Sequence, residues 1–191
     1  MPLNIPNLIT LSRIILIPLL IGIYYLPDGT LTEESKNIAA TAIFIFAGIT
    51  DWLDGYLARR WNQTTSFGAF LDPVADKLMV IAALIVLTEF GRIYALVALI
   101  IIGREITISA LREWMAQIGQ AKSVAVNMAG KVKTVAQLVA IPFLLFDDVL
   151  FGLFETRPVG HVLIWVAAGI TLWSMVVYLK AAWQSGAVGG K

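Results

Sequence analysis

Long apolar runs alternate with short polar connections along the whole sequence. The apolar runs cover residues 5–26, 37–58, 69–89, 92–114, 129–150 and 158–180. Each run approaches or exceeds the roughly 20 residues that a helix needs to cross a bilayer. The runs are continuous, as in IILIPLLIGIYYL, whereas strands of membrane barrels alternate apolar and polar positions. The pattern therefore predicts an all-α integral membrane protein, folded as a bundle of six transmembrane helices.

These six runs leave little chain for a separate soluble domain. We expect one six-helix transmembrane domain over residues 1–184, followed by a flexible C-terminal tail over residues 185–191. The composition agrees, because 59% of the residues are hydrophobic and 14% are charged, against about 25% charged in average soluble domains. The sequence has no cysteine and one histidine, which excludes disulfides, thiolate nucleophiles and Cys/His zinc sites.

The basic residues predict how the bundle is oriented. If the amino terminus is cytoplasmic, the loops on the far side hold only Lys36, Arg92 and Arg157. All other basic residues then fall on the cytoplasmic side, as the positive-inside rule requires. We therefore expect both termini in the cytoplasm.

Four aspartates lie in the stretch DWLDGYLARRWNQTTSFGAFLDPVADK, residues 51–77. Asp51 and Asp54 are three positions apart and Asp72 and Asp76 are four apart, so each pair shares one face of a helix. A turn through residues 59–66 would bring both pairs to the same membrane boundary. Four facing carboxylates repel one another and need a counter-charge. Ligands that are all oxygen favour Mg²⁺ or Mn²⁺.

Structural roles for these acids are an alternative. Asp72 before Pro73 is typical of a helix N-cap, and the first pair of aspartates could bind Arg59 and Arg60. Four acids at helical spacing, converging from two apolar runs, favour a functional site, because ionisable residues inside membrane spans usually have a function.

Small residues accompany the acids. Gly55 follows the first pair, and Gly68 lies one turn before the second pair. Such residues allow helices to pack closely, or they leave room for a ligand beside a metal. Arg59 could bind a phosphate through two parallel hydrogen bonds. The residues alone thus predict a metal-bridged phosphate site at the lipid–water boundary.

The full spacing of this stretch resembles the signature of the CDP-alcohol phosphatidyltransferases. The matching positions are Asp51-x2-Asp54-Gly55-x2-Ala58-Arg59-x8-Gly68-x3-Asp72-x3-Asp76. The length and the layout of six spans also resemble this family. The resemblance implies an enzyme that binds CDP-diacylglycerol, in which an alcohol attacks the phosphorus attached to the lipid and CMP is released.

The resemblance also assigns roles to residues. Two divalent metals would be held by Asp51, Asp54, Asp72 and Asp76. Asp76 would in addition be the catalytic general base. The CDP-diacylglycerol site would be lined by Gly55, Ala58, Arg59 and Gly68, with Asn7 and Thr10 near enough to reach it. The family likeness further implies a homodimer in the bacterial inner membrane, with its active site facing the cytoplasm.

The acceptor is predicted from two basic stretches. GREITISALREW contains Arg104 and Arg112, and GKVKT contains Lys131 and Lys133. Basic residues at membrane ends often only snorkel to headgroups, but four of them near the acids would suit an acceptor that carries a phosphate. Together with NIPNLITLSR, these stretches resemble the bacterial phosphatidylglycerophosphate synthases. That likeness implies glycerol 3-phosphate as the acceptor, bound by these four residues.

Other functions stay open at this stage. An inositol-phosphate acceptor or a cardiolipin synthase would use a similar site within the same family. A cation-coupled transporter also uses intramembrane acids, but here the acids cluster at one boundary and the spans show no inverted repeat. Arg13, one turn inside the first run, could either snorkel to the interface or reach the same cavity.

Overall fold

Six α-helices make up most of the computed structural model, which describes residues 5–60, 65–120 and 128–184. The side chains of residues 5–7, 54, 55, 57–59, 66, 69 and 128–131 lie outside that description. The helices are α1 (Ile5–Tyr24), α2 (Glu33–Arg60), α3 (Ser66–Glu89), α4 (Ala95–Gln117), α5 (Met128–Phe146) and α6 (Thr156–Gln184). They coincide with the predicted apolar runs to within a few residues, which confirms the all-α class.

One small hairpin was not predicted. Its strands β1 (Val149–Leu150) and β2 (Phe154–Glu155) pair antiparallel between α5 and α6. Phe151 and Gly152 in the turn both have positive φ angles, the backbone of a tight turn that matches the twist of the strands. The hairpin replaces the last residues of the predicted run 129–150.

The apolar character of the helices is uneven. Within the described ranges, α6 is the one helix whose length and hydropathy suffice to cross a membrane. Shorter apolar stretches occupy Leu8–Tyr24 in α1 and Val132–Phe146 in α5. Six helices of the predicted length are therefore present, while a membrane crossing by each of them stays a prediction.

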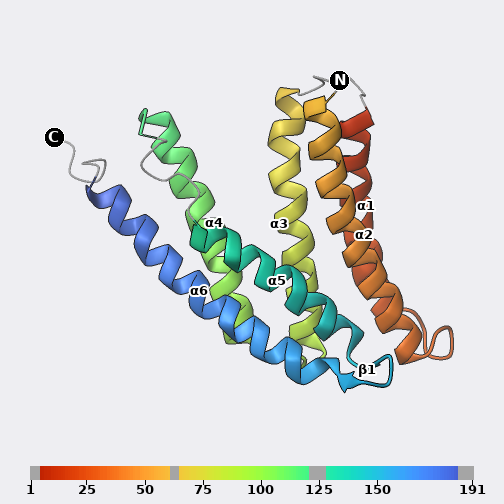
Figure 1. Ribbon diagram of the computed structural model, residues 1–191. Coiled ribbons are helices and arrows are strands. Elements are labelled where there is room, and N and C mark those ends of the chain that lie inside the picture. Colours follow the sequence, from red (N-terminus) through yellow and green to blue (C-terminus); the bar gives the residue numbers. More distant parts are fainter. Residues whose placement is uncertain (1–4, 61–64, 121–127, 185–191) are drawn as a thin grey trace.

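The helices form two arms (Figure 1). In one arm α1 packs against both α2 and α3, and in the other α6 packs against α4 and α5. Contacts of α5 with α2 and α3, and of α4 with α3, join the arms. The arms lie close together near the hairpin and diverge towards the end at which α1 begins and α6 ends (Figure 1).

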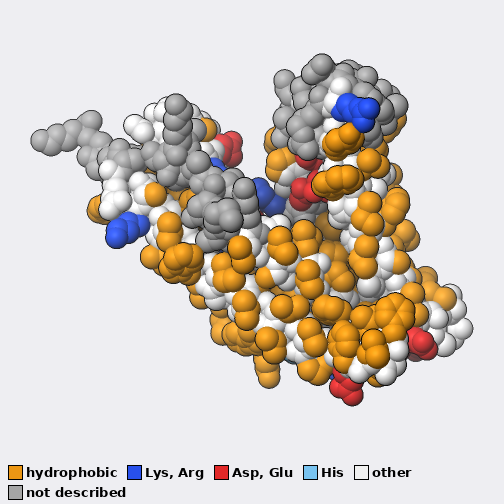
Figure 2. Space-filling model, viewed as in Figure 1, with side chains coloured by type: hydrophobic (Ala, Val, Ile, Leu, Met, Phe, Trp, Pro, Cys, Tyr) orange, Lys and Arg blue, Asp and Glu red, His pale blue; other side chains and the backbone are white. Residues whose placement is uncertain are grey.

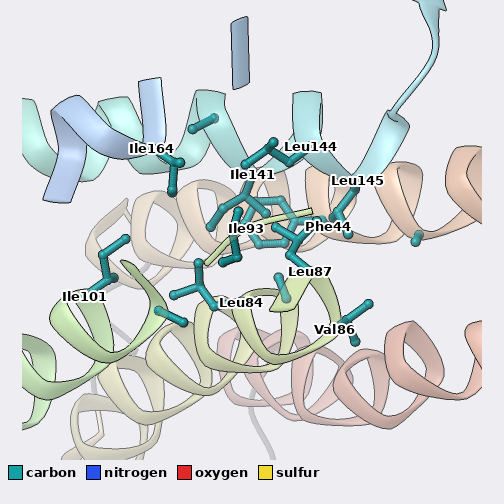
Figure 3. Packing of buried hydrophobic residues seen from close by; sticks show 14 of the residues in the cluster. Phe44, Leu84, Val86, Leu87, Ile93, Ile101, Ile141, Leu144, Leu145 and Ile164 are labelled. Carbon is teal, nitrogen blue, oxygen red and sulfur yellow. The ribbon is translucent and has the colours of Figure 1, made fainter. Parts of the chain in front are cut away.

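The hydrophobic core fills the half of the bundle next to the hairpin. Leu84 and Leu87 of α3 lie there with Ile101 of α4 and with Ile141 and Leu144 of α5, all fully buried (Figure 3). The core residues come from the second halves of α1, α3 and α5 and from the first halves of α2, α4 and α6. In the other half, a smaller apolar cluster that includes Ile108, Met115 and Tyr178 packs α4 against α6.

A close helix contact supports this core. A Cβ atom built on Gly160 of α6 would lie 2.7 Å from Cγ of Leu144 in α5. Only a glycine lets the two helices approach this closely, which is the usual reason for small residues at helix contacts in membranes. The contact fixes α6 against α5 directly after the hairpin.

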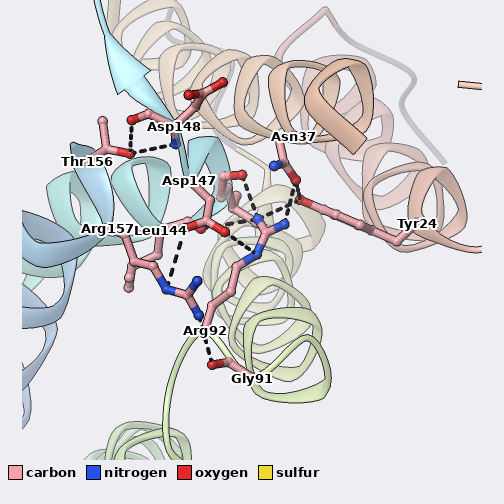
Figure 4. A network of polar contacts seen from close by, with 10 residues as sticks. Tyr24, Asn37, Gly91, Arg92, Leu144, Asp147, Asp148, Thr156 and Arg157 are labelled. Atoms are coloured by element: carbon pink, nitrogen blue, oxygen red, sulfur yellow. Dashed lines mark hydrogen bonds and ion pairs between the residues drawn. The ribbon is translucent and has the colours of Figure 1, made fainter. Parts of the chain in front are cut away.

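A buried arginine closes the hairpin end of the bundle (Figure 4). Arg92, between α3 and α4, donates to Oδ1 of Asn37 at 2.6 Å and to the carbonyl oxygen of Leu145 at 2.8 Å. It also pairs with Asp147 at 3.2 Å and lies over the ring of Tyr24. A buried charge is tolerated only with such partners. The network ties α1, α2 and α5 together, at the end opposite to the aspartates.

Candidate active site

Three of the four aspartates converge at the diverging end of the bundle. Asp51 comes from α2, and Asp72 and Asp76 come from consecutive turns of α3. Each carboxylate can place one oxygen within 4.8 Å of the other two. The predicted meeting of the two acidic pairs is therefore confirmed for these three residues. The side chain of Asp54 lies outside the described part.

The structural alternative for Asp72 is wrong. The N-cap of α3 is Thr65, whose hydroxyl oxygen accepts a hydrogen bond from the backbone N–H of Gly68 at 3.0 Å. A capping side chain must precede the helix, whereas Asp72 lies inside α3. Its carboxylate is therefore free to point sideways at Asp51 and Asp76.

Arg13 of α1 is the cation that meets these carboxylates. Its Nη1 donates to Oδ1 of Asp51 at 2.7 Å and also to Asp76, and its Nη2 donates to Asp72. Only 2% of the arginine side chain is exposed. Snorkelling therefore does not explain Arg13, and the expectation that it reaches the cavity is confirmed. Thr10, one turn earlier in α1, is buried as well.

The alternative pairing of Asp51 with Arg60 is not among the contacts of these two described residues. Arg60 instead donates to the hydroxyl of Tyr56 at 2.8 Å, on the exposed side of α2. The guanidinium of Arg13 reaches Asp51 from the inside of the bundle, where α1 packs against α2.

A basic cluster forms on the other arm around one tyrosine. The guanidinium carbons of Arg104 and Arg112, both in α4, lie 5.5 and 5.2 Å from the ring centre of Tyr178 in α6. Arg112 donates to the tyrosine hydroxyl at 3.0 Å, and Arg104 donates to the hydroxyl of Ser174 at 3.1 Å. The two arginines are thus held in place by contacts with α6.

Lys133 of α5 joins this basic cluster through a carboxylate. Glu105 accepts from Lys133 and pairs with Arg104 at 3.3 Å. Lys133 is almost fully buried, at 3% exposure. Lys77, which follows Asp76 on α3, lies within electrostatic range of Arg112 and Lys133. The predicted meeting of three of the four acceptor residues is therefore confirmed.

The acidic cluster belongs to the arm of α1, α2 and α3, and the basic cluster belongs to the arm of α4, α5 and α6. Figure 2 shows the surface notched between the two arms, with acidic and basic side chains beside the notch. Hydrophobic side chains cover most of the rest of the face drawn. The notch lies at the end of the bundle that the apolar core does not fill.

The acidic cluster fits a divalent cation. Its donors are all carboxylate oxygens, the ligands that Mg²⁺ and Mn²⁺ prefer, and their spacing allows all three to reach one ion. The buried guanidinium of Arg13 lies among these carboxylates, so a positive charge is already favoured at this position. Asp51, Asp72 and Asp76 could therefore hold a metal.

Several predicted site residues belong to described helices, but their side chains lie outside the description. These residues are Asn7, Asp54, Gly55, Ala58, Arg59 and Lys131. Gly68 lies in the first turn of α3, three residues after its N-cap. The roles of all these residues stay predictions.

Three residues that contact the predicted site were not identified from the sequence. Glu105, Tyr178 and Ser174 all contact predicted acceptor residues. Glu105 adjoins Arg104 in an otherwise apolar run, which is a detectable signal. Nothing local distinguishes Tyr178 from an interfacial aromatic residue, because its partners are 66 and more residues away in the chain.

An all-α bundle that sets carboxylates opposite basic residues at one end is consistent with the implied phosphotransferase. The chain matches the CDP-alcohol phosphatidyltransferase family over residues 3–173, and it belongs to this family. It is similar to the CDP-diacylglycerol–glycerol-3-phosphate 3-phosphatidyltransferase of Shigella flexneri serotype 5b (strain 8401), with 51% identity over 184 residues. That alignment covers 95% of this chain and 96% of the relative.

Two further relatives have the same name and coverage. They come from Salmonella choleraesuis (strain SC-B67) and Escherichia coli (strain K12), each 50% identical to this chain over 184 residues. The resemblance seen in the sequence is thus confirmed at the level of the family.

Proposed function

We propose that this chain transfers the phosphatidyl group from CDP-diacylglycerol to sn-glycerol 3-phosphate. The products are phosphatidylglycerophosphate and CMP, in the biosynthesis of phosphatidylglycerol. The half-identical relatives are named for this reaction. The observation that carries the proposal is the convergence of Asp51, Asp72 and Asp76 on one arm, with a cluster of basic residues on the other arm.

The acidic cluster suits the donor. Two divalent cations, Mg²⁺ or Mn²⁺, held by Asp51, Asp72, Asp76 and the neighbouring Asp54, would neutralise the diphosphate of CDP-diacylglycerol. The cytidine diphosphate would lie along the small residues between the acidic pairs, lined by Gly55, Ala58, Arg59 and Gly68 and reached by Asn7 and Thr10. Phosphoryl transfer depends mainly on such positioning and charge neutralisation.

The basic cluster suits the acceptor. Arg104, Arg112 and Lys133, with Lys131 nearby in the sequence, would bind the phosphate of glycerol 3-phosphate. Guanidinium groups bind phosphate oxygens through two parallel hydrogen bonds. Alcohols without a phosphate, such as serine, would leave these cations without an anionic partner.

The reaction is a direct displacement. One of the two free hydroxyl oxygens of glycerol 3-phosphate attacks the phosphorus attached to the lipid, and Asp76 takes the proton of that hydroxyl. The bond between that phosphorus and the CMP oxygen breaks, and CMP leaves with the electron pair. The sequence has no cysteine, so a thiolate intermediate is excluded.

The surface supports a place in the bacterial inner membrane. Large apolar side chains project outward along the helices, among them Ile15, Trp52 and Leu99, each more than 60% exposed. A soluble monomer rarely exposes such extensive apolar surface, and lipid would cover it. We place the notch on the cytoplasmic side, where the positive-inside rule puts most basic residues, and we expect a homodimer as in the family.

The test is CMP release by purified protein in detergent micelles. We expect release to require both substrates and Mg²⁺ or Mn²⁺, and to be abolished by a chelator. Asp76→Asn should abolish turnover and leave binding of CDP-diacylglycerol intact. Metal-independent turnover, or full activity of Asp76→Asn, would contradict the proposed site.

The choice of acceptor distinguishes the proposed reaction from the other activities of the family. The same assay with inositol phosphate or phosphatidylglycerol as acceptor should give little CMP. Faster release with either of them would reassign the enzyme to another activity of the same family. Metal-driven ion flux in vesicles without CMP release would favour a transporter instead.

A further inference from the structure

Arg13 lies between the three carboxylates of the acidic cluster, although α1 itself carries none of them. It donates through Nη1 to the Oδ1 atoms of Asp51 and Asp76 and through Nη2 to Oδ1 of Asp72. Its side chain is only 2% exposed, whereas those of the carboxylates are 37–41% exposed. The guanidinium therefore approaches from inside the bundle, and the carboxylates remain partly exposed.

A metal ion in this cluster would use the same groups. The three carboxylates that contact Arg13 are the three that can place oxygens within 4.8 Å of one another. A guanidinium and a divalent cation repel each other, and both bind carboxylate oxygens. Simultaneous full occupation by both cations is therefore unfavourable.

We propose that Arg13 is a built-in competitor for the divalent metal. Its guanidinium offsets part of the negative charge of the three aspartates, and its repulsion opposes the binding of a divalent ion beside it. Arg13 is then a positioning residue that lowers metal affinity and stabilises the metal-free fold. This inference rests on the metal site of the proposed function.

This competition also links metal binding to α1. In the structure, Arg13 connects α1 to α2 through Asp51 and to α3 through Asp72 and Asp76. Metal binding would weaken these links, while the apolar contacts of α1 with α2 and α3 would remain. Thr10, a predicted donor-site residue, lies one turn before Arg13 on the same helix.

The test measures Mn²⁺ binding without substrate. Arg13→Gln removes the charge and keeps a polar side chain. Even at the dielectric constant of water, a monovalent cation about 5 Å away weakens the binding of a divalent one roughly tenfold. We therefore expect the Kd for Mn²⁺, measured by electron paramagnetic resonance on protein in micelles, to fall at least about tenfold in Arg13→Gln.

Thermal unfolding gives a second readout. The metal-free Arg13→Gln protein should unfold at a lower temperature than the wild type, because its carboxylates lose their counter-charge. Addition of Mn²⁺ should then raise the unfolding midpoint of Arg13→Gln by more than it raises that of the wild type. Arg92→Gln is the matched control, since it removes a buried, ion-paired arginine at the opposite end. It should lower the midpoint equally with and without Mn²⁺ and leave the Kd unchanged.

The outcomes are distinguishable. Unchanged or weaker Mn²⁺ binding in Arg13→Gln contradicts the competition while leaving the proposed function intact. A wild-type protein that binds no Mn²⁺ contradicts the metal site, and the inference with it. If Arg13→Gln does not fold without metal, Arg13→Lys replaces it. The shorter lysine side chain cannot contact all three carboxylates as the guanidinium does, so we expect the Arg13→Lys protein to bind Mn²⁺ more tightly than the wild type. Mn²⁺ binding no tighter than that of the wild type would overturn the proposal.

Discussion

Replacement of Lys133 by methionine tests the acceptor pocket most sharply. Lys133 is 3% exposed and contacts Glu105. Methionine keeps most of the length of the side chain and removes its charge. The carboxylate of Glu105 retains Arg104 as a partner at 3.3 Å, so we expect the variant to fold. Its thermal midpoint, measured in the same micelles, should stay close to that of the wild type.

The size of the effect follows from the lost contact. A hydrogen bond to a charged group contributes about 1.5–3 kcal/mol. Because about 1.4 kcal/mol corresponds to a factor of ten, the KM for glycerol 3-phosphate should rise roughly 10- to 150-fold. The KM for CDP-diacylglycerol should change by less than about twofold on this reasoning, because the donor binds at the acidic cluster.

The assay is CMP release with one substrate saturating and the other varied. Lys180→Met is the matched control, because Lys180 lies on the exposed surface of α6 and should leave both KM values unchanged. Equal increases in the two KM values for Lys133→Met, or a loss confined to kcat, would refute the assignment of Lys133 to the acceptor phosphate.

Further predictions concern the basic cluster around Tyr178 and the contact between α5 and α6. Arg112→Ala should raise the KM for glycerol 3-phosphate far more than that for CDP-diacylglycerol in the CMP assay. Tyr178→Phe keeps the ring beside both arginines and loses one hydrogen bond, about 0.5–1.5 kcal/mol, so the same KM should rise only several-fold. Gly160→Val overpacks the contact with Leu144 and should lower stability by about 1–3 kcal/mol, measured as a lower thermal midpoint. Gly169→Val, with no atom within 4 Å, is its control.

The helices could be predicted from the sequence because each apolar run is long and continuous and does not alternate with polar positions. The acidic pairs could also be placed, because positions three or four apart share a helix face. The family signature then added the reaction. Local spacing was sufficient for these features, since each depends on residues within one helix or one turn.

Several contacts between helices that lie far apart in the sequence could not be predicted. Arg13 meets Asp76 across 63 positions of the chain, and nothing local separated that contact from snorkelling. Arg92 was predicted only as a basic residue in a far-side loop, yet it is buried and ties several helices together. An N-cap role for Asp72 was also plausible until Thr65 proved to be the cap. Each of these depends on how the helices pack, which a single sequence does not specify.

The most direct test of the central claim is the incorporation of labelled glycerol 3-phosphate into lipid. Purified wild-type protein with CDP-diacylglycerol and Mg²⁺ should convert the label into a chloroform-soluble product with the mass of phosphatidylglycerophosphate, with one CMP released per lipid formed. Asp76→Asn should yield none. Release of CMP without label in the lipid, or label in the lipid at the wild-type rate in Asp76→Asn, would contradict the account.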